Sequence, residues 1–316
     1  MTTITQQLLI DEANRRGYAV TKFGERDRYL RIGLPNGTKN LLRGSRPLES
    51  SANGTKIAID KLLTLQFVEA CGFKVPAYQL LEDEEDALQF LKTHTSIVIK
   101  PLDSSGGRGV TANITSRERA TTAFRYAKTH SDSGKVLAQA YLTGKLYRLL
   151  VVDGQMVATA ERTAASVLGD GTSSLRELVQ TVNDQPRRNG TNTAHGHILH
   201  SDMHEYLGGN MLETIPVAGK AVRLNQIESL STGGEATNVT NEVHPSWGEA
   251  AGRITKQLGL LIAGFDIMCD DIAEPLSNSY FPMLEINSMP GFKLHEYPTT
   301  GSPVHIAPLL LDAISR

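Results

Sequence analysis

The stretch KPLDSSGGRGV, residues 100–110, joins two apolar runs with the pattern of β-strands, SIVI at 96–99 and VTANI at 110–114. Glycine and serine favour any tight turn, so the loop by itself is compatible with a phosphate site and with an ordinary surface connection. In the P-loop and the dinucleotide-binding fold, the glycine loop opens a helix whose N-terminus meets the phosphates. Here a strand follows, and neither motif is present. A glycine loop between two strands instead indicates a flap that closes over a ligand.

The composition is that of a globular protein. Of the 316 residues, 40% are apolar and 21% are charged, and the net charge of −2 does not indicate nucleic acid or an anionic membrane as a partner. The chain start lacks the pattern of a secretory signal, and no apolar run approaches the ~20 residues of a membrane-spanning helix. Cys71 and Cys269 have no partner motif and suit a reducing compartment. We therefore expect a cytoplasmic protein.

The pattern along the chain predicts three structural units. Residues 1–52 are expected to form a small entry unit with a helix, a strand and a hairpin that turns at Asn36–Gly37. The second unit, 53–135, contains the glycine loop. The third unit, 136–316, contains a polar and irregular insertion near 185–210.

Apolar periodicity and capping residues predict that helices and strands are mixed along the chain. The expected helices are 56–72, 83–94, 116–130, 172–183 and 245–259. In the C-terminal half we expect a hairpin about Asp153–Gly154 and strands at 261–269 and 280–287. Because several strands are joined by hairpins, the pattern favours an α+β fold over a doubly wound sheet.

Oxygen-bearing side chains gather on the last two expected strands. Glu285 and Asn287 are two residues apart, so both point to one face of their strand, and Asp266 lies near the end of the preceding strand. Carboxylate and carboxamide groups without His or Cys are the ligands of a hard cation such as Mg²⁺. The alternative is that these are ordinary polar positions on a half-exposed sheet.

Two further features each allow two interpretations. Lys100 ends an apolar strand, so it can aim at phosphate or extend its ammonium group into solvent. In the insertion, the pair His200 and His204 has the spacing of zinc ligands on a helix. No cysteine or further fixed ligand accompanies that pair or the nearby His195 and His197, so a solvated loop is the favoured interpretation.

Taken together, a strand lysine, a glycine flap and a late Asp…Glu-x-Asn cluster resemble the ATP-grasp superfamily. Five stretches in order look like the ATP-grasp module of cyanophycin synthetase and, more loosely, the glutathione-synthetase module of the bifunctional glutathione enzymes. These stretches are VIKPLDSSGGRGVTANIT, VLGDGTSSLRELVQTVNDQPRR, LSTGGEATNVTNEVHP, LGLLIAGFDIMCDDI and LEINSMPGFKLHEYP. The resemblance extends over residues 55–300.

The resemblance implies the ATP-grasp fold, in which two α/β subdomains clasp ATP. Residues 53–135 are then the lid subdomain with the flap, and 136–316 the C-terminal subdomain, after the short unit 1–52. The implied activity is an ATP-dependent carboxylate–amine ligase that uses Mg²⁺, or Mn²⁺ in its place, on amino acids or a short peptide. The γ-phosphoryl group passes to the carboxylate, and the amine then displaces phosphate from the acyl phosphate. Because the N-terminal domain and the second ligase domain of cyanophycin synthetase are missing, we do not expect synthesis of the full polymer.

The resemblance also implies roles for individual residues, in three groups. The residues expected to hold the nucleotide are Lys61, Lys100, the flap residues Ser104, Ser105, Gly106, Gly107, Arg108 and Gly109, and the hinge residues Gln139, Ala140 and Tyr141. The residues expected to bind the metal are Asp266, Glu285 and Asn287. The residues expected to act on the acid substrate and the acyl phosphate are Arg148, Arg162, Lys293 and His295.

Two departures from the family pattern support alternatives. Gln139 stands where an acid is expected at the hinge, and the run NQIES at 225–229 replaces an arginine-bearing run. Both changes suit a nucleotide-binding regulatory subunit that has lost turnover, and a kinase-like phosphotransferase is a third reading. The short entry unit leads us to expect that a neighbouring subunit completes the acid site, in a homo-oligomer.

Overall fold

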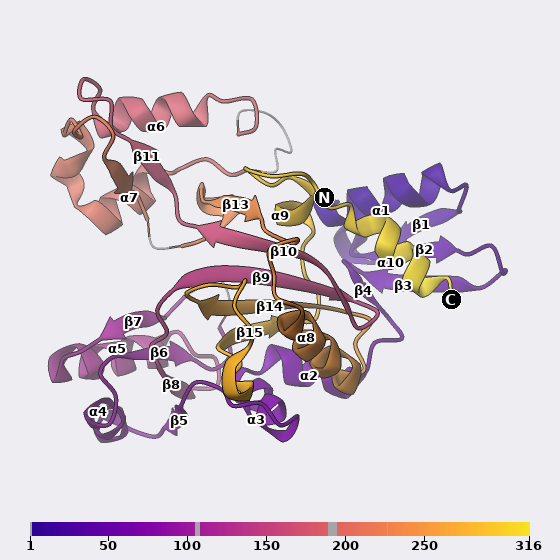
Figure 1. Cartoon of the computed structure of the whole chain (residues 1–316), viewed down its shortest axis with the longest axis horizontal. Coiled ribbons are helices and arrows are strands. Elements are labelled where there is room, and N and C mark those ends of the chain that lie inside the picture. Colours follow the sequence, from indigo (N-terminus) through magenta and orange to yellow (C-terminus); the bar gives the residue numbers. More distant parts are fainter. Residues whose placement is uncertain (1, 105–107, 189–194, 226) are drawn as a thin grey trace.

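The computed structural model describes the whole chain except residues 1, 105–107, 189–194 and 226. It contains a small N-terminal sheet, a lid sheet with two helices, a central sheet and a separate lobe (Figure 1). The mixture of helices and antiparallel sheets confirms the predicted α+β class. Within the described residues, no helix is both long and apolar enough to cross a membrane.

The N-terminal unit consists of one helix and an antiparallel sheet in the order β1-β2-β3-β4. Its elements are α1 (Ile4–Arg15), β1 (Val20–Phe23), a 3-10 turn at Glu25–Asp27, β2 (Tyr29–Gly33), β3 (Lys39–Arg43) and β4 (Arg46–Pro47). Thr3 and Gln6 form a capping box that starts α1. Buried residues of this unit, such as Leu9 and Ile32, share one core with the C-terminal helix α10 (Ile306–Ile314) and with the central sheet. The unit is therefore packed onto the rest of the molecule.

The lid is a second antiparallel sheet, in the order β5-β8-β6-β7, covered by α4 and α5. Its elements are β5 (Tyr78–Leu81), α4 (Glu84–Lys92), β6 (Ile97–Pro101), β7 (Thr111–Ile114), α5 (Arg117–Thr129) and β8 (Val136–Ala140). Strands β6 and β7 pair on either side of the glycine loop, which confirms the predicted strand–loop–strand arrangement. Strand β8 pairs with both β5 and β6, so the lid sheet extends past the expected boundary at residue 135.

The single helix predicted at 56–72 is in fact two helices, α2 (Ala52–Ile59) and α3 (Lys61–Ala70). They are separated at Asp60, whose backbone is extended and whose carboxylate accepts hydrogen bonds from the backbone N–H groups of Leu62 and Leu63. Aspartate favours such a cap because it satisfies N–H groups that have no partner in the first turn. The break places Lys61 at the first position of α3.

The central sheet has the order β13-β10-β9-β14-β15, and its neighbouring strands are antiparallel. Its strands are β9 (Lys145–Val152), β10 (Gln155–Thr163), β13 (Glu235–Asn238), β14 (Ile262–Cys269) and β15 (Met283–Asn287). The predicted hairpin is confirmed: Asp153 and Gly154 connect β9 to β10, both with positive φ. Helix α8 (Pro245–Leu258) packs on one face, and α1 and α10 cover part of the other (Figure 1).

The remaining lobe corrects the prediction of an irregular insertion at 185–210. It contains β11 (Ser166–Leu168) paired with β12 (Ala221–Arg223), α6 (Leu175–Asn183), α7 (His200–Leu207) and a 3-10 helix at Gly209–Glu213. Ile198, Met203 and Leu212 are buried against α6, so this segment folds around its own core. The apolar residues of α7 are separated by polar ones, such as His200 and His204, so the composition of the segment did not predict a helix.

Three short elements complete the chain. These are the 3-10 turns at Leu230–Thr232 and Ser277–Ser279, and α9 (Lys293–Glu296), a single turn of helix that follows the loop after β15. That loop, residues 288–292, reaches the N-terminal unit, because the Phe292 N–H donates a hydrogen bond to Thr5 Oγ1. The loop thus connects the end of the central sheet to the start of the molecule.

Candidate functional site

The N-terminal unit and α10 cover only part of one face of the central sheet, and the predicted site residues lie at the edge of the covered part. Along β9, Arg148, Leu150 and Val152 point to the same face, since side chains alternate along a strand. Leu150 and Val152 are buried beneath the N-terminal unit, whereas Arg148 lies beyond its edge. The strand register places Arg148 opposite Asp266 on β14, and Asp266 opposite Glu285 on β15. The three residues therefore form a row across the sheet.

Asp266 lies in the centre of this row and is held by two arginines. Arg148 donates to it through Nε and through Nη2, the latter at 2.9 Å, and Arg162 Nη1 donates at 3.2 Å. Asp266 is only 6% exposed. Its burial opposes ionisation, but the two guanidinium groups hold the pKa of Asp266 below its ordinary value. The two guanidinium groups are balanced by Asp266 and, through space, by Glu285.

Glu285 and Asn287 lie next to Asp266 on the edge strand β15. Asn287 Nδ2 donates to Glu285 Oε1 at 3.0 Å, which turns the amide oxygen of Asn287 away from that carboxylate. Two carboxylates and an amide oxygen on adjacent strands are a donor set that suits Mg²⁺. These residues fit Mg²⁺ when Asp266 gives up an ion pair with an arginine and binds the metal instead.

Two lysines lie at the lid edge of the same region. Lys100 is 7% exposed, and its ammonium group donates to Gln139 Oε1 at 2.6 Å. Burial, together with the nearby Lys61, lowers the pKa of Lys100 to about 8. Lys61 donates to the backbone carbonyls of Leu102 and Ser104 at 3.2 Å and 2.5 Å, and burial lowers its pKa as well. Across the described ranges, neither lysine forms an ion pair, so both cations can accept an anionic ligand.

Gln139, where the family pattern leads us to expect an acid, is buried between the lid sheet and β15. Its side chain accepts a hydrogen bond from Lys100 and donates one to the Met283 carbonyl, and a glutamate at this position would neutralise that lysine. The neighbouring N–H groups of Ala140 and Tyr141 donate to Ala77 and Ser96 carbonyls at 2.8 Å and 3.0 Å. These two hinge N–H groups are therefore used within the protein in this structure.

The glycine flap is described at its two ends. Ser104 Oγ donates to the Arg108 carbonyl at 2.8 Å, and Gly109 has a φ of +74°, which favours glycine. Asp103 anchors the base of the loop by accepting hydrogen bonds from the backbone N–H groups of Asp132 and Ser133. The predicted nucleotide contacts of Ser105, Gly106 and Gly107 lie outside the described residues.

A small cavity of about 170 Å³ adjoins the arginines. It is lined by Arg148, Arg162, Lys293, Glu235 and Ser229, among others. The cavity brings together the two hairpin arginines and Lys293 as the sequence suggested, and adds Glu235 and Ser229, which the sequence reading missed. Glu235 lies in the motif stretch LSTGGEATNVTNEVHP and Ser229 ends the run NQIES, but the sequence assigned neither side chain a role.

His295 is placed differently from the other predicted residues of this group. It is 2% exposed, and burial together with Arg148 lowers its pKa to about 3, so the imidazole is neutral at pH 7. Its Nε2 has no hydrogen-bond partner among the residues that the structure describes. The ring therefore packs in the interior near Arg148 and does not line the small cavity.

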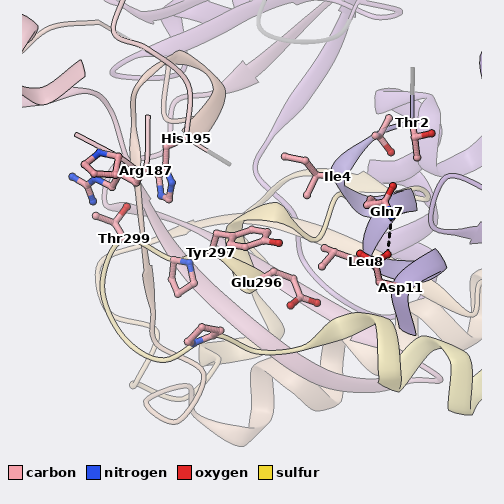
Figure 2. A pocket seen from close by; sticks show the side chains of 14 residues that line it. Thr2, Ile4, Gln7, Leu8, Asp11, Arg187, His195, Glu296, Tyr297 and Thr299 are labelled. Carbon is pink, nitrogen blue, oxygen red and sulfur yellow. Dashed lines mark hydrogen bonds between the residues drawn. The ribbon is translucent and has the colours of Figure 1, made fainter. Parts of the chain in front are cut away.

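A larger cavity of about 810 Å³ is lined in part by Glu296, the last residue of α9 (Figure 2). Its walls are the start of α1, the segment 296–303, and Arg187 with His195 from the lobe. Arg187 pairs with Glu235 at 3.2 Å, and Glu235 lines the small cavity, so the two cavities are neighbours. The combined volume of the two cavities exceeds the volume of a single amino acid.

The four histidines of the insertion have different surroundings. His195 is buried in the wall of the large cavity, and burial and nearby cations lower its pKa to about 4. His197 contacts the Arg188 carbonyl, whereas His200 and His204 are exposed on α7. No group of three or more His, Cys, Asp or Glu side chains in the described ranges is arranged to hold a metal ion.

Residues 60–177 match the family model described as the ATP-grasp domain of prokaryotic glutathione synthetase. The chain is 33% identical over 315 residues to a cyanophycin synthetase of Trichormus variabilis. The alignment covers 98% of this chain and 34% of that protein. It is 28% identical to the glutathione biosynthesis bifunctional protein GshAB of Mannheimia succiniciproducens, over 94% of this chain and 41% of that protein. The chain thus spans about a third of the length of the cyanophycin synthetases that it matches.

Solved structures give the same result for the fold. The bifunctional glutathione synthetase of Pasteurella multocida superimposes with a TM-score of 0.71 and 25% identity, over 98% of this chain and 43% of that one. The D-alanine–D-alanine ligase of Bacillus anthracis superimposes with a TM-score of 0.51 at 14% identity, over 84% of this chain and 69% of that one. The latter likeness is one of fold alone.

Proposed function

Because the chain belongs to the ATP-grasp superfamily, we propose that it is an ATP- and Mg²⁺-dependent ligase that joins a carboxylate to an amine. The observation that carries this proposal is the row formed by Arg148, Asp266 and Glu285, with Lys61 and Lys100 at its lid side. The row offers metal ligands, and the surrounding cations suit a triphosphate and an acyl phosphate. Cationic groups fixed in a buried site stabilise developing negative charge more strongly than the same groups in water.

The proposed roles follow from these positions. Lys61 and Lys100 bind phosphate oxygens of ATP, and the flap closes over them. Asp266, Glu285 and Asn287 would hold Mg²⁺, which would supply charge neutralisation for the phosphates. With Asp266 shared with the metal, Arg148 and Arg162 would be free to bind the substrate carboxylate and the phosphoryl group that it receives.

The reaction then proceeds in two displacements. A carboxylate oxygen attacks the γ-phosphorus and ADP leaves, giving the acyl phosphate. The amine, as its free base, attacks the acyl carbon, and inorganic phosphate leaves as the amide forms and the nitrogen loses a proton. Arg148, Arg162 and Lys293 around the small cavity hold the anionic groups in place during both steps, which is mostly a positioning role.

We assign the substrates to amino acids or a short peptide. The small cavity, about 170 Å³, takes a reacting end group, while the neighbouring cavity of about 810 Å³ lies within the range of small-molecule pockets and takes the remainder. The homo-oligomer stays a prediction, and sedimentation velocity of the purified chain is the measurement that checks it.

A catalytically silent regulatory subunit is the second candidate. The observation that favours it is the double ion pair on Asp266, which occupies the carboxylate that the metal needs. In that case the chain binds Mg-ATP but does not turn it over.

The deciding experiment is ADP release with Mg-ATP and pooled amino acids and dipeptides, with and without the amine components. Amine-dependent ADP release that is lost in Glu285→Gln supports the ligase. ATP binding without ADP release from any pool supports the regulatory subunit, and ADP release with a stable phosphorylated acid and no need for an amine supports a phosphotransferase. A suitable control is Glu249→Gln, because Glu249 is exposed on α8, the helix that covers the opposite face of the sheet.

A further inference from the structure

A third cavity, of about 570 Å³, lies between the N-terminal unit, the end of α10 and the connection from α8 to β14. Leu261 in its wall accepts a hydrogen bond from the N–H of Asp153, so the cavity adjoins the turn of the β9–β10 hairpin. Asp266 is five residues further along the chain on β14, which puts it about 16 Å away at the rise of a β-strand. Among the described residues, the cavity shares no lining side chain with the two cavities near the reaction centre.

A polar residue occupies a core position in the wall of this cavity. Side chains alternate along β3, so Asn40 faces the same side as the buried Leu42, and it lies opposite the buried Ile32 on β2. Asn40 itself is only 8% exposed. Its amide nitrogen donates to Glu49 Oε1 at 3.1 Å. Because an ionised carboxylate can only accept, this contact fixes the orientation of the amide and turns its oxygen away from Glu49.

Two buried oxygen atoms in this wall lack a hydrogen bond. Asn40 Oδ1 and Ser50 Oγ are both buried, and neither has a partner among the residues that the structure describes. An unpaired buried polar atom destabilises a fold, and an apolar side chain at position 40 would avoid this loss. A ligand that donates to Asn40 Oδ1 would supply the missing hydrogen bond, which gives the asparagine a reason to be there.

The charged side chains of the wall include one unpaired group of each sign. Glu49 and Lys39 are exposed, and across the described ranges neither forms an ion pair. Arg316, the remaining charged residue of the wall, pairs with Asp153 at 2.7 Å. The carboxylate of Glu49 and the amide oxygen of Asn40 therefore offer acceptors for a cation, while the ammonium group of Lys39 is free to bind an anion.

The rest of the wall is largely apolar. Its apolar members are Leu34, Leu260, Leu261, Ala313 and Ile314. A wall of this kind with a few polar groups, around a volume of about 570 Å³, is typical of a small-molecule site. Taken together, the wall matches a ligand that carries a positive group, a negative group and an apolar part.

We propose that this cavity binds an amino-acid zwitterion with an apolar side chain, as a free amino acid or a dipeptide. The ammonium group of the ligand donates to Glu49 and to Asn40 Oδ1. Its carboxylate accepts from Lys39 and from Ser50 Oγ, and its side chain packs on the apolar wall. This is a second site, apart from the reaction centre, and it does not depend on the proposed ligase activity.

The test is calorimetric titration of the whole chain without nucleotide, with L-leucine and L-leucyl-L-leucine as probes. We expect at least one probe to bind with a Kd on the order of 1 mM or below. The amide of that probe lacks the carboxylate, and its deamino analogue lacks the ammonium group. Each should bind roughly ten- to a hundredfold more weakly, as expected for a lost charged hydrogen bond. The proposal is overturned if neither probe binds, or if both analogues bind as tightly as the probe.

Variants of the wall locate the bound probe. Glu49→Gln and Lys39→Gln should each weaken binding roughly tenfold or more. Asn40→Leu should abolish binding and keep or raise the melting temperature, because it removes a buried oxygen that has no partner in the described part of the chain. Glu285→Gln, at the reaction centre, should leave binding unchanged. Binding that is lost in Glu285→Gln but kept in Glu49→Gln would place the probe at the reaction centre and overturn the proposal.

The matched control is Glu25→Gln, because Glu25 is an exposed acid of the same N-terminal unit that does not line the cavity. It should bind the probe as the wild type does, and a loss as large as that in Glu49→Gln would contradict the site. If Asn40→Leu lowers the melting temperature, the variants of the exposed Glu49 and Lys39 decide the question. Unchanged binding in both of them overturns the proposal.

Discussion

Two groups of buried cations lie on opposite sides of the proposed nucleotide site, and they differ in how their charge is balanced. At the lid edge, Lys100 donates to the neutral amide of Gln139 and forms no ion pair within the described residues. At the centre of the sheet, Arg148 and Arg162 share the carboxylate of Asp266. The first group carries an uncompensated charge that a ligand can neutralise, whereas the second is neutralised by the protein and must be released to act. A substitution that removes a charge should therefore mainly weaken ligand binding at the lid edge, but mainly destabilise the fold at the centre of the sheet.

The largest effect is expected for Asp266→Asn, measured as the free energy of unfolding of the protein without ligand. Removing this carboxylate breaks the ion pairs of two buried guanidinium groups and leaves them only the more distant charge of Glu285 among the described residues, a loss of about 3–5 kcal/mol for a broken buried pair. Denaturant unfolding gives the value. The matched control is Asp312→Asn, which breaks the pair of Arg16 with a carboxylate that is 56% exposed and should cost less than about 1 kcal/mol. Equal losses in both variants would contradict the comparison.

At the lid edge, Lys100→Met should leave the stability of the empty protein unchanged or higher at pH 7, because the lysine is buried and, among the described residues, forms no ion pair. The affinity for a non-hydrolysable ATP analogue should fall roughly ten- to a hundredfold, as expected for a lost charged hydrogen bond. Calorimetric titration measures this change. A large loss of stability in Lys100→Met would show that the two groups do not differ in the way described.

The same lysine predicts a pH dependence with a definite sign. Its folded-state pKa is lowered to about 8, below the ordinary value of 10.5, so the folded chain releases this proton earlier than the unfolded chain. The cost of burying the charge is fully present below pH 8 and is relieved as the pH rises toward 10.5. Lys100 should therefore make the free energy of unfolding rise over this interval. Unfolding curves of wild type and Lys100→Met between pH 7.5 and 10 check it, since the variant should lack this contribution.

The smallest effect is expected for Gln139→Glu, which makes the lid group resemble the central one. The new carboxylate neutralises Lys100, so it should raise the pKa of that lysine and remove most of the rise in stability above pH 8. Nucleotide affinity should fall by only about two- to fivefold, because the lysine can still turn to the phosphates in exchange for the carboxylate. Gln139→Met is the control, since it removes the hydrogen bond without adding charge. An unchanged pH profile in Gln139→Glu would show that Gln139 does not govern the charge of Lys100.

Much of the fold follows from short-range patterns. The apolar runs on either side of residues 100–110 predicted two strands around a glycine loop, and the Asp153–Gly154 pair predicted a hairpin. Ser174 and Glu177 have the spacing of a capping box, and the structure contains it. Each of these features depends on residues a few positions apart, whose local conformations and hydrogen bonds are set by residue type. Patterns over a few residues failed at α7, where buried residues of the lobe alternate with polar ones.

The candidate site divides in the same way. The sequence by itself determined the α+β class, the motif stretches and the residue types of a nucleotide and metal site. Only the tertiary structure decided what these side chains touch: Arg148 meets Asp266 across 118 positions, and Gln139 meets the Met283 carbonyl across 144. Such contacts depend on strand register and on how the lid sheet packs against β15. Register and packing are settled by the burial of whole faces of the sheet, a property of distant segments that no single stretch contains.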